Sequence, residues 1–288
     1  MRHELAIEVA GRAIASADAL LIGAGAGMGV DSGLPDFRGN QGFWTAYPPY
    51  QHLGLDFFSL ANPRWFETDQ SLAWGFYGHR LEMYRRTQPH DGFAILHSWA
   101  ERMHHGAFVY TSNVDGHFQK AGLSPDRVLE IHGSLEWLQC TRSCGSGIFP
   151  SDSVHVDVDK NTMRAKEPLP RCPVCAALAR PNVLMFEDRT WDAERAGQQE
   201  VRLGAWLEAV NQARLVIVEC GAGTTIPSVR HFCERMAAIY GATLIRINLR
   251  EPQVPEGQVG LATSSLAGLH AIDRWVNRET GAQQKREI

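Results

Sequence analysis

The stretch LLIGAGAGMGVDSGLPDFRG, residues 20–39, sets the expected fold. Its first half is an apolar run that enters alternating glycines, which is typical of a buried strand followed by a turn whose N–H groups approach a phosphate. A usual dinucleotide turn then continues into a long helix, whereas here Pro35 interrupts the chain soon after the last of these glycines, Gly29. Alone, the glycines also fit a strand-to-helix turn that binds no nucleotide.

Further short apolar runs recur along the chain between segments of helical spacing. They predict strands at 19–22, 107–111, 128–132, 181–186, 215–219 and 243–248. Short strands that alternate with helices indicate a parallel sheet covered on both faces. We therefore expect an α/β protein with a Rossmann-like, doubly wound parallel sheet.

Two segments interrupt this pattern and are expected to form a small domain. Residues 42–90 are rich in aromatic residues, with a helix predicted at 71–86, and residues 137–180 carry four cysteines and no helical stripe. The main, nucleotide-binding domain would then comprise 1–41, 91–136 and 181–288, with a frayed tail at 279–288.

The four cysteines indicate a metal site. They form two close pairs, Cys140 with Cys144 and Cys172 with Cys175. Four thiolates satisfy the tetrahedral preference of Zn²⁺, and this spacing is typical of a metal site rather than of a disulfide framework. Because no histidine or carboxylate within the pairs suggests an open coordination position, we expect a structural zinc ion.

Polar residues follow two of the predicted strands. Asn113 and Asp115 come after the strand at 107–111, and His132 ends the strand at 128–132. Ligands of open α/β sheets bind at the carboxyl ends of strands, where Asn and Asp can hold an amide or a hydroxyl. Asn113 and Asp115 could instead only cap the next helix, and His132 is equally a structural histidine or a proton acceptor.

Composition excludes several classes of partner. The net charge of −4 gives no basic field for nucleic acid. No apolar run is long enough to span a bilayer, and the N-terminus has no signal-peptide pattern. We expect a cytoplasmic protein without a direct nucleic-acid or membrane partner.

The order of these motifs resembles that of the sirtuins, the NAD-dependent protein deacylases. The likeness spans about residues 20–250 and consists of segments 25–27, 32–39, 111–116, 119–122, 130–134, the four cysteines, 180–186, 223–225 and 247–248. It implies that NAD binds between the two domains and is consumed in removing an acyl group from a lysine of a protein substrate.

The resemblance also implies roles for particular residues. The acyl oxygen attacks C1′ of the nicotinamide ribose, nicotinamide leaves, and His132 deprotonates a ribose hydroxyl. Asn113 and Asp115 would hold the ribose and the nicotinamide amide, and Phe37 and Arg38 would close over the nicotinamide. The implied NAD-binding residues are Gly25, Ala26, Gly27, Asp36, Phe37, Arg38, Ser112, Asn113, Asp115, Gly221, Gly223, Thr224 and Asn248.

The substrate side is implied by Phe186 and by a pair in the first insert. In the sirtuins that accept malonyl- and succinyl-lysine, a Tyr and an Arg separated by two residues line the acyl pocket, and Tyr77 and Arg80 match that spacing. Residues three apart share a helix face, so one carboxylate could meet both side chains. We expect acidic acyl groups to be accepted, with acetyl-lysine as a second substrate. The alternative is an amphipathic helix with Arg80 in solvent.

The chain departs from the usual sirtuin wording in four places. Gly29 stands where Ser or Thr is common, Ser112 replaces Gln, three residues separate Cys140 from Cys144, and Phe186-Glu187-Asp188 replaces Phe-Gly-Glu. Ser112 bears most on NAD, because a shorter side chain at the ribose leaves room for water.

Three other functions stay open. Ser112 gives weight to an ADP-ribosyltransferase or NAD glycohydrolase on the same fold, and a non-catalytic NAD or acyl-peptide sensor would use the zinc module as an interaction surface. A hydride-transfer dehydrogenase fits the glycines alone and gives Asn113 and Asp115 no task.

Overall fold

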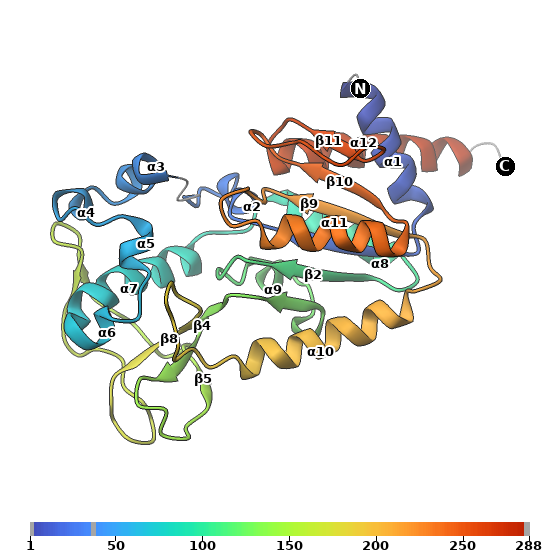
Figure 1. The fold of residues 1–288 in the computed structure, drawn as a ribbon. Helices are drawn as coiled ribbons and strands as arrows, with labels where there is room; N and C mark the ends of the chain where they lie inside the picture. Colours follow the sequence, from blue (N-terminus) through green and yellow to red (C-terminus); the bar gives the residue numbers. More distant parts are fainter. Residues whose placement is uncertain (1–2, 36–38, 285–288) are drawn as a thin grey trace.

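The computed structural model describes residues 3–35 and 39–284, with side chains at 3–35 and 43–279 (Figure 1). Its centre is a sheet of six strands in the order β11-β10-β9-β1-β2-β3, and every neighbouring pair is parallel. The strands are β1 (Ala19–Ala24), β2 (Ala107–Thr111), β3 (Val128–Glu130), β9 (Leu215–Cys220), β10 (Thr243–Ile247) and β11 (Val259–Leu261). The predicted α/β fold with a parallel sheet is confirmed.

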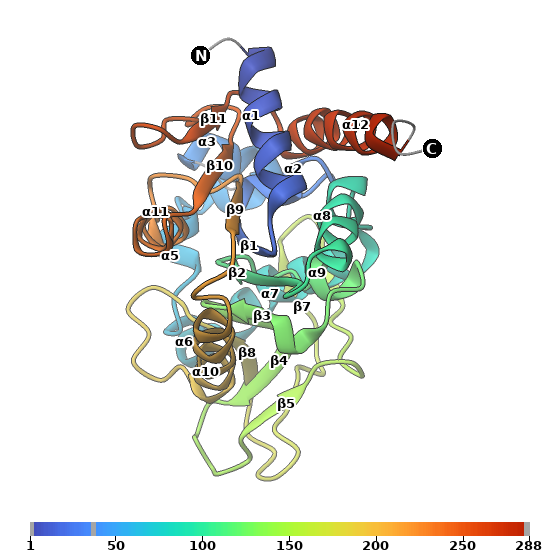
Figure 2. The same ribbon diagram turned by 90° about the vertical axis from the view of Figure 1, so that its right-hand side faces the viewer.

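Helices cover both faces of this sheet, as Figure 2 shows with the sheet nearly edge-on. One face carries α1 (His3–Ser16), α8 (Asp91–Arg102) and α12 (Ser265–Gln284), and the other carries α10 (Glu194–Ala209) and α11 (Ser228–Tyr240). A separate apolar core fills each side. The central strand β1 is buried along its whole length, which explains its unbroken apolar run.

The elements of the two inserts lie beyond the carboxyl ends of the strands. They include the antiparallel sheet β5-β4-β8, the hairpin β6-β7 and the helices of the first insert. Their bounds are α3 (Gly39–Ala46), α4 (Pro48–His52), α5 (Phe57–Leu60), α6 (Trp65–Thr68), α7 (Gln70–Arg86), β4 (Gly133–Cys140), β5 (Ile148–Pro150), β6 (Val158–Asp159), β7 (Arg164–Ala165) and β8 (Ala179–Val183). Side chains from both inserts share one core, for example Trp74 and Leu178. The exact division into two domains stays a prediction.

Two expectations about secondary structure were wrong. The strand expected at 181–186 in the parallel sheet is β8, which pairs antiparallel with β4 in the smaller sheet. An apolar run fits a parallel or an antiparallel sheet equally well. The strand that pairs with β8 is β4, which directly follows His132 and was not predicted. The tail expected to fray at 279–288 continues helix α12 as far as Gln284.

The second insert holds helix α7 along its length. Near its start, Asp69 accepts two hydrogen bonds of 2.8 Å from Arg164. Farther along, a Cβ atom on Gly75 would lie 2.0 Å from the carbonyl oxygen of Met163, so only glycine fits there. Near the end of the helix, Arg85 donates to the carbonyl oxygen of Val154 at 2.7 Å. The position of α7 thus depends on the insert that carries the cysteines.

Two main-chain turns touch at the carboxyl ends of β1 and β9. A Cβ atom on Gly25 would lie 2.7 Å from Cα of Ala222, and one on Gly27 would lie 2.8 Å from Cα of Gly221. The Gly27 N–H donates to the carbonyl oxygen of Gly221 at 3.0 Å. Gly221 itself has a φ of 62°, a conformation that favours glycine. These glycines are therefore required for packing between the turns, whatever they bind.

Replacing Gly27 by Ala should lower the free energy of unfolding by about 1–3 kcal/mol, because backbone atoms must move to admit the methyl group. The measurement is urea denaturation. Gly204→Ala is the matched control, since Gly204 lies in α10 with no atom within 4 Å of an added Cβ. The control should gain up to about 1 kcal/mol from helix propensity. Equal midpoints for Gly27→Ala and wild type would contradict a tight contact between the turns.

Candidate active site

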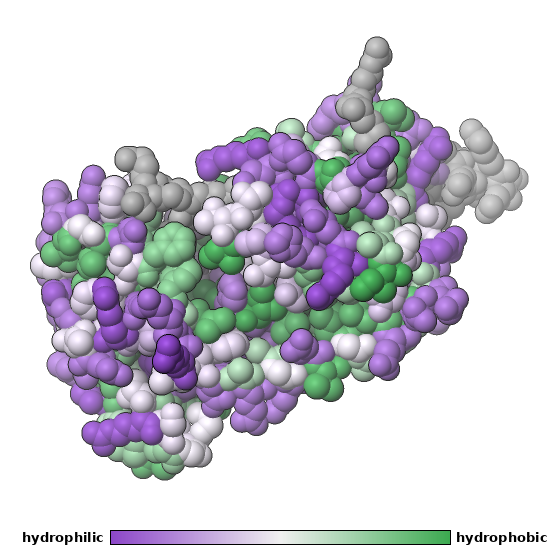
Figure 3. All heavy atoms as spheres, in the orientation of Figure 1, coloured by the Kyte–Doolittle hydropathy of each residue, from purple (hydrophilic) through white to green (hydrophobic). Residues whose placement is uncertain are grey.

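A cavity of about 570 Å³ opens where the parallel sheet meets the inserts. It is lined by the residues that directly follow strands β1, β2 and β9, among them Gly25, Ser112 and Gly221. The space-filling view shows a recess between the α5–α7 region and the α11 region, with hydrophobic surface around it (Figure 3). This is the edge at which open α/β sheets bind ligands.

Most of the predicted site residues meet in this cavity. Those that line it are Gly25, Ala26, Tyr77, Arg80, Ser112, Asn113, Asp115, His132, Phe186, Gly221 and Gly223. Asn248, Thr224 and Gly27 do not line the cavity. Asn248 is buried behind the lining and donates to the carbonyl oxygen of Ala222 at 2.8 Å, whereas Thr224 is exposed and its hydroxyl donates to Glu251. Gly27 contacts Gly221 instead. The predicted residues Asp36, Phe37 and Arg38 lie outside the described residues.

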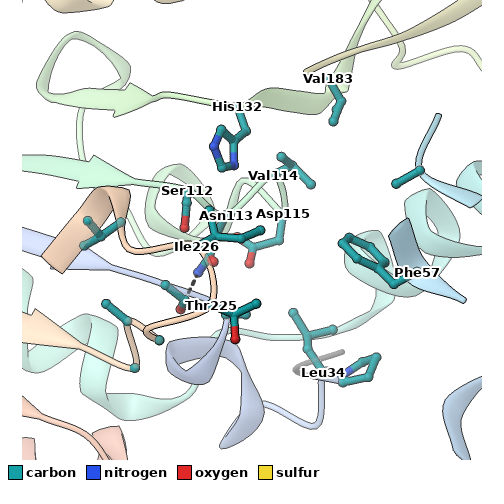
Figure 4. A pocket seen from close by; sticks show the side chains of 18 of the residues that line it. Leu34, Phe57, Ser112, Asn113, Val114, Asp115, His132, Val183, Thr225 and Ile226 are labelled. Carbon is teal, nitrogen blue, oxygen red and sulfur yellow. Dashed lines mark hydrogen bonds between the residues drawn. The ribbon is translucent and has the colours of Figure 1, made fainter. Parts of the chain in front are cut away.

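Asn113 and Asp115 are fixed by the turn after β2. The Asn113 side-chain amide donates to the carbonyl oxygen of Gly25 at 3.0 Å, which ties this turn to the glycine turn (Figure 4). Asp115 accepts the His117 N–H at 2.9 Å at the start of helix α9 (His117–Lys120). Asp115 thus bonds the first N–H of this helix in an Asx turn, as the alternative proposed for it, whereas the Asn113 side chain bonds the glycine turn, and both residues line the cavity.

His132 lies between β3 and β4, and its ring faces the same space as Ser112, Asn113 and Asp115 (Figure 4). Its carbonyl oxygen accepts the Leu184 N–H at 2.9 Å, which fixes the backbone there. Burial lowers the pKa of His132, against a smaller opposing effect of the Ser112 backbone. The ring is therefore neutral at pH 7 and can accept a proton.

Helix α7 supplies a cation to the opposite wall. Arg80 is only 6% exposed, so the alternative of a solvated arginine is wrong. Its guanidinium carbon lies 5.2 Å from the Phe76 ring and 5.9 Å from the Phe57 ring. Burial raises the pKa of Tyr77 to about 12 although the Arg80 charge opposes it, so the phenol keeps its proton.

Sequence reasoning missed several lining residues on the inserts. Tyr84 follows Tyr77 and Arg80 at helical spacing and lies on the same wall, so the i, i+3, i+7 pattern could have found it. Phe57 and Phe58 line the mouth, and no spacing rule marked them within an aromatic-rich segment.

The Phe186 segment shows how one sequence departure is accommodated. The Phe186 ring lies 4.6 Å from Phe58, and its N–H donates to the carbonyl oxygen of Ala61 at 2.9 Å. Glu187 has a φ of 58°, in the left-handed region where glycine is usual. Its carboxylate accepts the Asn62 side-chain amide at 3.1 Å, which helps to offset this strain.

The four cysteines come together in the second insert. Their sulfur atoms all lie within 4.8 Å of one another, with 3.6 Å between Cys140 and Cys175 and 3.5 Å between Cys144 and Cys172. A tetrahedral zinc ion with bonds of about 2.3 Å requires sulfur separations of about 3.8 Å. The extra residue between Cys140 and Cys144 is taken up by Ser143, whose φ is 48°. The cluster thus fits a structural zinc ion that joins the end of β4 to the segment before β8.

Comparison with known proteins agrees with this arrangement. The profile of the Sir2 family matches residues 25–218. The chain belongs to the Sir2 family. Similar relatives are NAD-dependent protein deacylase 2 of Pyrobaculum aerophilum, 32% identical over 237 residues and 82% of each chain, and the NAD-dependent protein deacylase of Aquifex aeolicus, 29% identical over 261 residues, 90% of this chain and 95% of that one. A solved Sir2 homologue mutant in complex with ADP-ribose superposes with a TM-score of 0.67 at 26% identity, covering 98% of both chains.

Cys172→Ser should remove the bound zinc and lower the melting temperature by about 5–15 °C, because the ion replaces a larger core in this insert. Zinc content by mass spectrometry and calorimetry measure the two effects. Cys233→Ala is the control, since Cys233 is a buried residue of α11 outside the cluster and its loss should leave the zinc content unchanged. Equal zinc content in Cys172→Ser and wild type would contradict this site.

Proposed function

We propose that the protein is an NAD-dependent protein lysine deacylase that releases nicotinamide and O-acyl-ADP-ribose. The observation that carries the proposal is one cavity that joins the glycine turn, a neutral His132 and the buried Arg80. Membership of the Sir2 family and the two relatives named as NAD-dependent protein deacylases support it. The partner would be an acylated-lysine protein in the cytoplasm.

The proposed NAD site lies on the sheet side of the cavity. NAD supplies a ribose carbon that accepts the acyl oxygen as nicotinamide leaves. The N–H groups of Gly25 and Gly221 donate to the carbonyl oxygens of Cys220 and Ile247, so they are not the phosphate donors. The turns bring the next residues, Ala26 and Gly223, to the cavity, where main-chain N–H groups would suit phosphates. Asn113 and Asp115, held by the bonds described above, would position the ribose and the nicotinamide amide.

His132 would act as the general base. Its lowered pKa keeps the ring unprotonated at neutral pH, so it can take a proton from a ribose hydroxyl. The aromatic rings of Phe57, Phe58 and Phe186 stand at the opposite side and would exclude water from the acyl group.

The acyl end would meet Tyr77 and Arg80. A buried guanidinium favours an anionic acyl terminus, and the protonated Tyr77 phenol can donate to the same carboxylate. We therefore propose malonyl- and succinyl-lysine as preferred substrates and acetyl-lysine as a second one.

One observation favours a second candidate. Ser112 lines the cavity beside Asn113, and its small side chain leaves space at the ribose for water or another acceptor. NAD hydrolysis or ADP-ribosyl transfer would use that space. Mass spectrometry after incubation with NAD and acyl-peptides separates the functions: O-acyl-ADP-ribose supports the deacylase, whereas free ADP-ribose or labelled protein supports the second candidate. NAD binding without nicotinamide release would favour a sensor.

The pH dependence of kcat/KM should show an acid limb with its midpoint below 6.5. The base is active when neutral, and burial shifts its protonation to lower pH, so activity persists as pH falls to 6.5 and is lost below it. Nicotinamide release is the assay.

His132→Ala should lower kcat at least about 100-fold. His97→Ala on α8 is the control, and loss of activity at or above pH 7 would contradict the assignment.

Arg80→Met should lower kcat/KM for a succinyl-peptide about 100-fold while changing that for the acetyl-peptide less than about fivefold. The physical reason is that only the succinyl group presents a charge to the guanidinium. Both peptides need the same sequence, and product is measured by mass spectrometry. Equal losses for the two peptides would remove the assignment of Arg80 to the acyl group.

A further inference from the structure

The hydroxyl of Tyr84 is hydrogen-bonded to Arg80, the buried arginine of the proposed acyl pocket. Both Nε and Nη2 of Arg80 donate to the Tyr84 hydroxyl oxygen, at 3.0 and 2.5 Å. The two residues lie one turn apart on α7, both are 6% exposed, and both line the cavity. The guanidinium carbon of Arg80 also lies 5.3 Å from the Tyr84 ring centre. The Nε–Nη2 edge of the guanidinium is therefore occupied by Tyr84, which fixes the orientation of Arg80 toward a ligand.

The same hydroxyl has a hydrogen atom to give. Within the described parts of the chain, its hydrogen bonds are with Arg80, where it acts as acceptor. A phenol oxygen accepts two bonds and donates one. Burial raises the pKa of Tyr84 although Arg80 opposes it, and the nearby negative charge of Asp115 adds to the rise, so the hydrogen stays on the phenol.

We propose that Tyr84 is a third residue of the acyl-carboxylate subsite, which fixes Arg80 by its Nε side and donates its own hydroxyl hydrogen to the carboxylate of a malonyl or succinyl group. This inference rests on the proposed deacylase function. A hydroxyl that accepts from a cation is polarised and becomes a stronger donor, so the carboxylate gains from both residues together. An acetyl group ends before this pair and gains nothing from either.

The test is Tyr84→Phe, which keeps the ring and removes the hydroxyl. KM for a succinyl-peptide should rise about tenfold with kcat unchanged, and both constants for the matched acetyl-peptide should stay within about twofold. Tyr110→Phe is the control, since Tyr110 is not among the residues that line the cavity. Its ring stacks on that of Phe232, with 3.7 Å between the ring centres. Melting temperatures of both variants show whether the fold is kept.

A double-mutant cycle with Arg80→Met gives a second readout. If Tyr84 acts through Arg80 and the carboxylate, Tyr84→Phe should change succinyl KM less than about twofold in the Arg80→Met background. Additive effects, or equal losses for both peptides, would overturn the role of Tyr84 and assign it to packing. A wild-type protein that removes acetyl but not succinyl groups would overturn the acidic subsite as a whole. Sensitivity to Arg80→Met without sensitivity to Tyr84→Phe would overturn the role of Tyr84 alone.

Discussion

The close approach of two main-chain turns is the constraint on which the site depends. Gly25 and Gly27 touch Gly221 and Ala222 with no room for a side chain on either glycine of the first turn. Asn113 adds a hydrogen bond from a third turn, and Asn248 holds the second from behind. Three crossovers of the parallel sheet are thereby locked together, so the lining of the cavity is set by backbone contacts before any ligand arrives.

The opposite wall of the cavity, formed by α5 and α7, is positioned by side-chain packing. Its aromatic residues pack into one core with the cysteine-bearing insert, and its charged group, Arg80, is buried among rings. Taking a guanidinium out of water is costly unless it is hydrogen-bonded, and Tyr84 supplies that partner. The two sides of the cavity thus differ in kind: backbone turns form one, and a buried charge among aromatic rings forms the other.

Local patterns predicted the parts of the fold that local physics decides. The strand at 107–111 and the helix at 71–86 appear close to their expected bounds, and the cysteine spacing anticipated the cluster. The strand at 181–186 was placed in the wrong sheet, because partner choice depends on β4, whose own pattern is weak. Within the site, strand-end residues were predictable from topology. Tyr84 could have been found from its helical spacing to Tyr77 and Arg80. Phe57 could not, since it lines the cavity only because α5 folds against it.

The position of helix α7 depends on a different part of the chain from the one that carries its own residues. The helix carries the residues proposed to face the acyl group, yet its position is fixed by the cysteine-bearing insert, through Arg164, Met163 and Val154. If α7 contacts the acyl group as proposed, metal binding and acyl selectivity are linked equilibria, whereas the residues proposed for NAD lie on the other side of the cavity, which backbone contacts fix independently. Removing the metal would then lower the selectivity between acyl groups before it lowered the affinity for NAD. Selectivity would be the property that is lost first.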